Sequence, residues 1–577
     1  IEQGGSRLTI RVRGFYTGLT AKQTSLQYTA RMTFEYNKST VRMEVTHVNA
    51  ILDREFSDFN SLGVTFQPAE VSSHAEAKCT ESDALPLQRG SRVFQETDEY
   101  LTLNGGDRQA KRLNGGLTLH LQEQKIDVAL AECWQRWPKA FSLSPQGNIV
   151  VELLPEQPHA TFNRDLPHYL LFPFCEGKYR LKWGMAFTEK LIFDFAPGQS
   201  RSAEAEATMP VIAVLPPSWY RETAVFPGAR LDFTEKPDQK FIASFRLRME
   251  NARAQREFGY LNYGDGYGER ETNWANNEYD LANILFLTFI RTGERDLFRW
   301  ALTAARHCAN VDTVHAYPDP FFVGGQQVHT IGHTGNYKGW SSPFNAWTSA
   351  RNGHTWVNGI VAAWQLYGEA VTFEAAAMTA DHIAFAQVPN YPKLEQTERS
   401  AGWPLRAVCT MYLATYDPVY LKAAKHYAML AAKACKADRG GAWPHPIYRL
   451  VQTREDNTEG NTLFMTGILL SAICDYAKIT GDPEVLKTID SVSRWMLTAY
   501  DHNGGFDYDC AWNGQSLNFS IAWLNGLIAA PLGQAAALTG NPEVFQVACQ
   551  AMGLHFSEDS VFRPKVWQFR IPMPANF

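Results

Sequence analysis

Two periods of hydrophobic and polar residues divide the chain. Up to about residue 215 the period is two, as in Arg7–Arg13, where polar and apolar residues alternate. Residues 28–48 repeat this alternation on both sides of a polar Tyr36–Ser39 turn, which predicts a β-hairpin. Further strand-like runs, separated by glycine, proline and asparagine, lie at residues 117–121, 149–154 and 191–195. This region is therefore predicted to form an antiparallel β-sandwich.

After Pro216 and Pro217 the period becomes helical, and short markers recur between pairs of helices. In most markers a glycine occupies the position that ends one helix, where the backbone commonly adopts the left-handed conformation. An Asp or Asn then caps the next helix, and a proline fits its first turn. The five helix pairs predicted in this way are centred on Gly293, Gly368, Tyr416, Gly481 and Gly540.

Each predicted pair joins an apolar helix, such as residues 281–289, to an amphipathic one, such as residues 297–305. Such hairpins bury their apolar helices only against neighbouring pairs. A linear solenoid is the alternative to a closed toroid, but solenoid repeats usually keep a tighter period. We expect an α+β multidomain chain, with a β-sandwich at residues 1–215 and an α/α toroid at residues 216–577.

Composition excludes several classes of protein. A net charge of −6 over 577 residues is too mild for a polyphosphate-binding surface, so nucleic acid is not an expected partner. No apolar run reaches the roughly 18 residues that span a bilayer. The nine cysteines are scattered without a C-x-x-C pair, which indicates neither a thiolate zinc site nor a disulfide framework.

Aromatic residues make up 13% of the chain and include 16 tryptophans, which favours a carbohydrate-binding hypothesis. Core packing would account for most of these rings. No secretory leader precedes Ile1, as in a processed chain. A secreted or periplasmic location is favoured over a cytoplasmic one, and the oligomeric state stays open.

Histidines concentrate in one glycine-rich stretch. Five of the 15 histidines lie between residues 307 and 354, where even spreading would place about one. His329 and His333 are four residues apart, but neighbouring glycines indicate a loop and the metal-binding H-E-x-x-H pattern is missing, so no metal site is predicted. His307 is expected to be structural. His354 is a candidate for either helix capping or catalysis.

A second polar stretch, residues 263–280, precedes the first apolar helix. Asp265, Glu278 and Asp280 are candidates for the acid and base of a glycosidase, or for caps that hold neighbouring loops; capping is favoured for Asp280. Four tryptophans near the predicted funnel are candidates for stacking against sugars, although at least half are expected to be wall or core: Trp274, Trp340, Trp347 and Trp356.

Several strings resemble the exo-type rhamnogalacturonan lyases of polysaccharide lyase family 26 and their relatives. In the helical region they are Asn262–Asp265, Asn273–Asp280, Arg291–Gly293, Ala305–His307, Val311–His315 and His329–Gly335. In the β region they are Trp134–Lys139 and Lys190–Phe195, so the resemblance covers nearly the whole chain. It implies a β-sandwich and an α/α toroid, preceded in the family by a small β-barrel that we expect to be missing here.

The resemblance implies β-elimination at a uronic acid in a polysaccharide or oligosaccharide. The reaction needs a group that neutralises the carboxylate, a base that removes the C5 proton, and an acid that protonates the departing O4 oxygen. By residue chemistry His333 is the candidate base and Tyr337 the candidate acid. Arg351 and His354 complete the catalytic candidates.

The remaining candidates are expected to bind substrate: Tyr263, Asp265, Trp274, Asn276, Asn277, Glu278, His315, His329, Trp340 and Trp356. Among them, Asn276 and Asn277 are amides suited to the carboxylate. No cofactor is required, and Ca²⁺ is a candidate aid to carboxylate binding.

Two other functions stay open. The first alternative is an exo-acting, glucuronidase-like glycoside hydrolase that uses Asp265, Glu269, Glu271 or Glu278. The second is a non-catalytic glycan-binding protein, which would leave the loop histidines without a task. Fold analogy alone does not choose among them.

Overall fold

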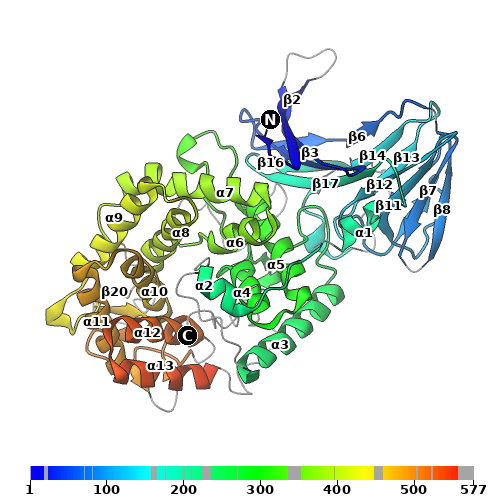
Figure 1. Cartoon of the computed structure of the whole chain (residues 1–577). Helices are drawn as coiled ribbons and strands as arrows, with labels where there is room; N and C mark the ends of the chain where they lie inside the picture. The colour runs from blue at the N-terminus through cyan, green and yellow to red at the C-terminus, as the bar shows by residue number, and fades with distance from the viewer. Residues whose placement is uncertain are drawn as a thin grey trace.

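The computed structural model has a β-rich N-terminal region followed by a helical region (Figure 1). It describes residues 2–17, 24–70, 72–80, 82–156, 166–175, 177–198, 202–209, 211–223, 226, 235–269, 271–334, 353–394, 397–447, 459–501, 505–521 and 524–555.

Antiparallel strands form two main sheets in the first region. The larger has the order β1 (Glu2–Gln3), β2 (Arg7–Thr17), β3 (Thr24–Glu35), β4 (Thr40–Val48), β17 (Ala186–Asp194), β12 (Lys125–Leu130), β11 (Leu113–His120), β7 (His74–Cys79) and β8 (Ser82–Gln88). The smaller has the order β10 (Leu101–Leu103), β9 (Arg92–Gln95), β13 (Lys139–Leu143), β14 (Ile149–Leu154) and β6 (Leu62–Phe66). The predicted hairpin at residues 28–48 is β3 and β4, paired from Gln27 with Val48.

The two sheets share one hydrophobic core. Leu117 and Leu119 of the larger sheet and Phe141 and Val151 of the smaller sheet belong to the same buried cluster. The alternation in β7 follows from this arrangement, because Ala75 and Ala77 lie in the core while their neighbours lie on the opposite face. A third, smaller sheet contains β15 (Phe174–Cys175), β16 (Lys178–Lys182) and β5 (Phe56–Phe59).

The helical region contains the five predicted helix pairs, preceded by three further helices in the described residues. The pairs are α4 (Leu281–Thr292) with α5 (Arg295–His307), α6 (Asn358–Tyr367) with α7 (Ala370–Asp381), α8 (Arg399–Thr415) with α9 (Pro418–Ala434), α10 (Leu463–Thr480) with α11 (Pro483–Thr498), and α12 (Gly526–Thr539) with α13 (Pro542–His555). Before them lie α1 (Ala203–Thr208), α2 (Pro217–Thr223) and α3 (Glu235–Ala254).

The predicted markers end the first helix of every pair. Gly293, Gly368, Tyr416, Gly481 and Gly540 all adopt the left-handed conformation there. The next helix is capped in three pairs by a side chain that accepts a backbone N–H: Asp417, Asp482 and Asn541. These local predictions are confirmed.

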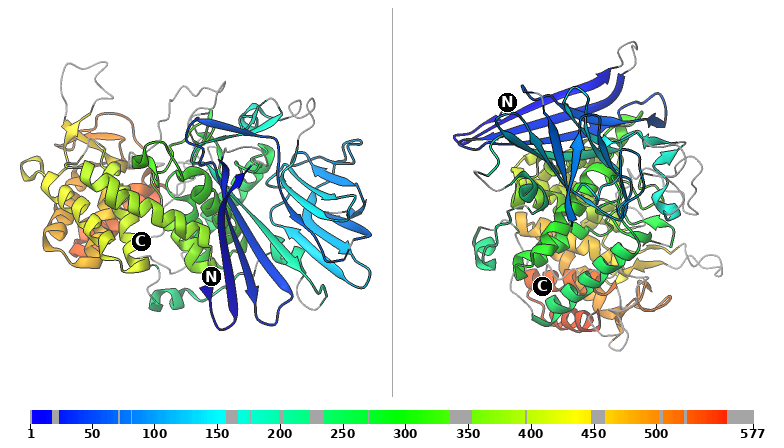
Figure 2. Two further views of the ribbon diagram at one scale, coloured as in Figure 1. Left: turned by 90° about the horizontal axis from the view of Figure 1, so that it is seen from above. Right: turned by 90° about the vertical axis from the view of Figure 1, so that its right-hand side faces the viewer.

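The first helices of the pairs pack against one another in sequence, from α4 through α6, α8 and α10 to α12. The second helices lie outside them along an arc, the arrangement of an α/α toroid (Figures 1 and 2). Within the described residues, α10 alone is long and apolar enough to cross a membrane, and 78% of it is buried inside the protein. It is an inner helix of the toroid.

Small strands lie in the loops that precede the inner helices. They are β18 (Tyr267–Glu269), β19 (Asn273–Trp274), β20 (His445–Pro446), β21 (Glu459–Thr462), β22 (Tyr500–Asp501), β23 (Gly505–Phe506) and β24 (Asp509–Ala511). Strands β20, β21 and β24 form one sheet, which ties the loop before α10 to the loop before α12. The loops are therefore held in place where the inner helices begin.

Candidate functional site

The first two inner helices begin side by side. The carboxylate of Asp280 accepts the backbone N–H of Asn283 in α4 and that of Gly359 in α6, the latter at 3.1 Å. Burial raises the pKa of Asp280 to about 6. The capping role predicted for this residue is confirmed, and it fixes two positive helix ends at one place.

Charged side chains gather at these helix starts. We call this set the helix-start cluster: Glu269, Glu278, His329, His354 and Arg399. Glu278 Oε1 lies 3.8 Å from His354 Nδ1 and 3.9 Å from Arg399 Nη1. Glu269 Oε2 lies 3.6 Å from His329 Nε2, and the two imidazole rings are 4.9 Å apart between centroids. The cluster thus combines two imidazoles, two carboxylates and a guanidinium.

The helix-start cluster retains some contact with solvent. The side chains of His329 and His354 are each 8% exposed, and that of Arg399 is 19% exposed. Arg399 is the first residue of α8, so three successive inner helices contribute to the cluster or to the loops that carry it. Sequence reasoning missed Arg399, although a position where an inner helix begins is close to the signal that identified Glu278 before α4.

A neighbouring set at the start of α10 was also missed. Glu398 Oε1 accepts the side-chain amide of Asn461 at 2.5 Å and lies 3.4 Å from His445 Nε2. Burial opposes protonation of His445, but the hydrogen bond and charge of Glu398 outweigh it and raise the histidine pKa. Glu398 precedes Arg399 in the chain, so this set adjoins the helix-start cluster.

A second group of histidines is fully enclosed. We call it the buried histidine cluster: Asp265, His307, Asp312 and His333. Asp265 Oδ2 lies 3.3 Å from His333 Nδ1 and 3.9 Å from His307 Nε2, which is 3.2 Å from Asp312 Oδ1. His333 Nε2 lies 3.0 Å from Asn262 Oδ1. Each member is at most 3% exposed.

Burial and mutual charge set the pKa values of this cluster. Burial lowers the pKa of His333 to about 4 and raises that of Asp312 to about 6. Burial also opposes the charged forms of His307 and Asp265. Asp312 nevertheless raises the pKa of His307, and the hydrogen bond from His333 with the charge of His307 lowers that of Asp265. His307 therefore lies between two carboxylates that favour its charged form, a buried position in keeping with the structural role predicted for it.

Asp265 also holds the loop before α4 in a strained conformation. It accepts the backbone N–H of Asn276 at 2.8 Å and of Asn277 at 3.0 Å. Both asparagines have positive φ angles near 50°, and His333 has a φ angle of 60°. Non-glycine residues in this region carry backbone strain that the surroundings must hold. The hydrogen bonds of Asp265 supply that restraint.

Several sequence-predicted site residues lie in enclosed positions. His333, the candidate base, is 0% exposed, and its ring centroid lies 4.9 Å from that of Trp274. The side-chain amides of Asn276 and Asn277 donate to the carbonyls of His333 and Ala304 rather than to a site open to solvent. These residues position the loop.

The two described tryptophan candidates are buried, in line with the expectation that at least half of the four are wall or core. Trp274 is 0% and Trp356 2% exposed, so neither ring presents a face to a sugar. The Trp356 indole donates to the carbonyl of Asn276 at 3.0 Å. His315 Nε2 is 2.8 Å from the carbonyl oxygen of Ala309, another structural contact. The remaining candidates lie outside the described residues: Tyr337, Trp340, Trp347 and Arg351.

Two of these groups have the donor set of a metal site. The ligand atoms of Glu278, His329 and His354 lie within 4.8 Å of one another, as do those of Asp265, His307 and His333. Imidazole and carboxylate are ligands that zinc accepts. No such ligand set was predicted from the sequence. Residues 278, 329 and 354 are far apart along the chain, and only the fold brings them together.

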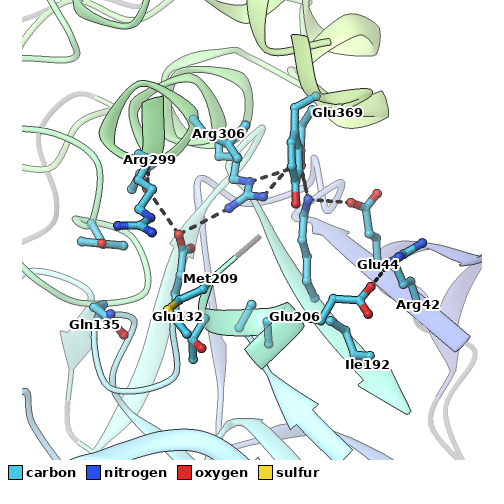
Figure 3. Close-up of a pocket in the computed structure, with 18 of the residues that line it drawn as sticks. Arg42, Glu44, Glu132, Gln135, Ile192, Glu206, Met209, Arg299, Arg306 and Glu369 are labelled. Atoms are coloured by element: carbon cyan, nitrogen blue, oxygen red, sulfur yellow. Dashed lines mark hydrogen bonds and ion pairs between the residues drawn. The ribbon is translucent and has the colours of Figure 1, made fainter. Parts of the chain in front are cut away.

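A separate cavity of about 1410 Å³ lies between the larger sheet and the helices (Figure 3). Tyr263 is part of its lining, and this candidate faces the cavity rather than the histidines. Its charges neutralise one another: Glu369 pairs with Arg306 at 3.2 Å and with Lys190 at 2.5 Å, and Arg306 pairs with Glu132 at 3.3 Å. We therefore place the candidate active site at the helix-start cluster and not in this cavity.

Comparisons with known proteins give only distant likenesses. No family model and no curated protein sequence matches the chain. The fold is similar to cellobiose 2-epimerase from Bacillus thermoamylovorans, at 10% identity over 56% of this chain and 87% of that one, with a TM-score of 0.39. A polysaccharide lyase gives 11% identity over 59% and 97%, with a TM-score of 0.38.

Unsaturated glucuronyl hydrolase from Bacillus sp. GL1 gives 13% identity and a TM-score of 0.29. That alignment covers 35% of this chain and 57% of the hydrolase. These neighbours are carbohydrate-active enzymes, but likenesses this distant carry no argument about activity. Membership of the rhamnogalacturonan lyase family stays a prediction.

Proposed function

We propose that the chain is a carbohydrate-active enzyme that cleaves a uronic-acid-containing glycan by β-elimination. The observation that supports this most is the helix-start cluster itself. An imidazole pair, a carboxylate and a guanidinium meet where parallel inner helices begin, and helix N-termini favour an anionic ligand such as a uronate. The cluster contains the groups that carboxylate neutralisation and proton transfer require.

Three tasks are divided among these side chains. Arg399 would pair with the uronate carboxylate and so stabilise the charge that develops when the C5 proton leaves. His354 would take that proton, and Glu278, 3.8 Å from its Nδ1, would stabilise the imidazolium that forms. His329 would return a proton to the departing O4 oxygen, with Glu269 beside its Nε2. A rhamnogalacturonan-like, exo-cleaved chain is the substrate that the family resemblance favours.

The first test is the release of ultraviolet-absorbing product from a panel of uronic-acid glycans. β-Elimination leaves a C4–C5 double bond that absorbs ultraviolet light, whereas hydrolysis does not. On the substrate that is turned over, His354→Ala should lower kcat by about 10²-fold to 10⁴-fold, the usual contribution of a positioned acid or base. His426→Ala, on outer helix α9, is the matched control and should keep full turnover. An unchanged rate in His354→Ala would remove the assignment.

A glycoside hydrolase is the alternative that the same residues allow, because Glu269 and Glu278 both lie in the cluster. A hydrolase would release products that have new reducing ends but do not absorb ultraviolet light. Glycan binding without any product would favour the non-catalytic alternative. The panel therefore separates all three functions.

The proposal extends to the organisation of the chain. We propose that residues 1–215 are a β-sandwich, supported by the core that its two main sheets share, and that residues 216–577 are the catalytic toroid. A secreted or periplasmic location fits a polymeric substrate. Ca²⁺ is proposed only as an aid to carboxylate binding, and activity should then fall on chelation and return with added Ca²⁺.

A further inference from the structure

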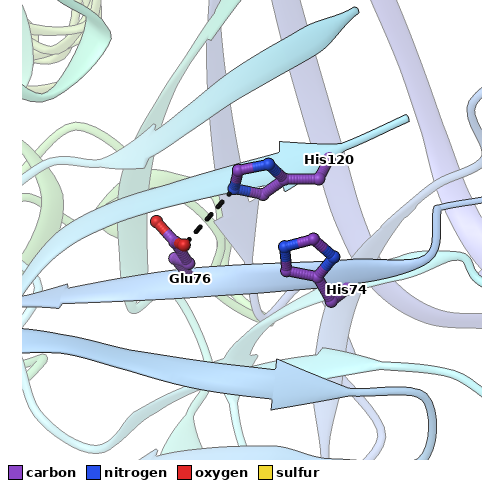
Figure 4. Close-up of side chains that lie close together, drawn as sticks. All are labelled: His74, Glu76 and His120. Atoms are coloured by element: carbon purple, nitrogen blue, oxygen red, sulfur yellow. Dashed lines mark ion pairs between the residues drawn. The ribbon is translucent and has the colours of Figure 1, made fainter. Parts of the chain in front are cut away.

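A third histidine cluster lies on the β region. His74 and Glu76 are on strand β7, and His120 is on the neighbouring strand β11 (Figure 4). The ligand atoms of the three side chains lie within 4.8 Å of one another. Neither the family resemblance nor the proposed catalytic chemistry uses these residues.

The strand register explains why the three side chains meet. In this antiparallel pair His74 lies directly opposite His120, and Glu76 is two residues further along β7. Residues two apart on one strand and the residue opposite on the next share a face of the sheet. The intervening residue Ala75 faces the core, so the cluster lies on the face away from the core.

The three side chains lie close enough to share one metal ion. The two imidazole rings are nearly parallel, with centroids 4.2 Å apart and planes inclined by 15°, so one ring must turn for a nitrogen of each to face the same ion. His120 Nε2 lies 3.5 Å from Glu76 Oε1. Two ligands of a tetrahedral zinc ion, each about 2.0–2.1 Å from it, are separated by about 3.3 Å, so this pair needs little movement.

Two further contacts support the arrangement. Ser73 Oγ lies 3.0 Å from His74 Nδ1 and fixes the orientation of that ring, as an outer partner of a metal ligand does. His120 Nε2 is shielded from solvent and makes no hydrogen bond within the described residues. Glu76 is 47% exposed, which leaves the cluster open to an ion from solution.

We propose that His74, Glu76 and His120 bind a divalent transition-metal ion of the zinc type. Two imidazoles and one carboxylate provide three ligands, and water would complete a tetrahedral set. Because these ligands belong to β7 and β11 alone, the site binds its ion independently of the toroid and of any glycan.

The test is titration of the full chain, freed of metal by chelation, with Co²⁺ and then Zn²⁺. Tetrahedral Co²⁺ gives visible absorption bands, and Zn²⁺ should displace it. His74→Ala and His120→Ala should each weaken Co²⁺ affinity at least tenfold, with the far-ultraviolet circular dichroism of the folded chain unchanged. His329→Ala and His307→Ala, which alter the other two histidine clusters, are the matched controls and should leave these bands in place.

Two outcomes would overturn the proposal. The first is that the Co²⁺ bands persist in His74→Ala and His120→Ala but are lost in His329→Ala or His307→Ala, which would assign the ion to the toroid. The second is that the unaltered chain gives no tetrahedral Co²⁺ spectrum and takes up no Zn²⁺. Because the readout is metal binding, a failure of the proposed glycan cleavage would not affect it.

Discussion

At the scale of single residues, Asp265 of the buried histidine cluster restrains the loop that leads into α4. Its two oxygens accept backbone N–H groups of the strained loop, and one of them also faces His333. Asp265→Asn would replace a charged acceptor by an amide that presents a donor to one of these partners. We expect a loss of about 3–5 kcal/mol in the free energy of unfolding, as when a buried charge pair is broken.

Urea denaturation of Asp265→Asn and of Asp296→Asn measures this loss against a matched change. Asp296 has an 80% exposed side chain on α5, so its substitution should alter the free energy of unfolding by less than about 0.5 kcal/mol. Equal stability of the two variants would show that Asp265 does not restrain the loop.

The same residue illustrates what the sequence can and cannot predict. Residue types and loop position singled out Asp265, His333 and Glu278, and the fold brings His333 to Asp265 and Glu278 to His354. The burial of His333 could not be predicted, because it depends on packing against Trp274 and Phe172, which come from distant parts of the chain. No local pattern contains that information.

At the scale of helices, Tyr416 ends α8 with a φ angle of 58° where glycine ends the other inner helices. A left-handed non-glycine residue costs roughly 1–2 kcal/mol, and the greater chain entropy of glycine offsets roughly 0.5–1 kcal/mol of it. Tyr416→Gly should therefore stabilise the protein by about 0.5–1 kcal/mol and raise Tm. Gly481→Ala, at a φ angle of 65°, is the reciprocal control and should lower Tm. The Tyr416 ring contacts Tyr412, with centroids 5.9 Å apart. A lower Tm in Tyr416→Gly would show that this contact outweighs the strain.

The helix pairs were predictable because their start and stop signals are local. Asp482 caps α11 through hydrogen bonds to residues two and three positions further on, which the sequence displays directly. Arg399 and His445 are different, because their partners Glu278 and Glu398 are 121 and 47 positions away (399 − 278 and 445 − 398). Only the packing of successive inner helices brings such residues together.

At the scale of the whole molecule, buried ion pairs join the β region to the toroid. Arg306 of α5 binds Glu369, which precedes α7 (Figure 3). Lys190 of β17 binds the same carboxylate. The side chain of Glu369 is 1% exposed. Burial disfavours its charged form, but the two cations outweigh this and lower its pKa to about 2.

This lowered pKa predicts how the stabilising effect of the Glu369 ion pairs depends on pH. A carboxyl group whose pKa is lowered by folding binds fewer protons in the folded state, so its stabilising effect is complete above its unfolded pKa of about 4.3. The effect declines as pH falls through the folded value of about 2. Glu369→Gln should therefore lower the free energy of unfolding by about 3 kcal/mol at pH 7, and this difference from the unaltered protein should shrink below about pH 4.

Urea denaturation of both proteins between pH 7 and pH 3 measures that difference. Glu374→Gln is the control from the same set of contacts, since Glu374 pairs with Arg11 and Arg31 but is 43% exposed. Its effect should not exceed about 1 kcal/mol, because solvent screens an exposed pair. If the difference in free energy of unfolding between Glu369→Gln and the unaltered protein stays constant from pH 7 to pH 3, the charge of Glu369 does not stabilise the contact between the sheet and the helices.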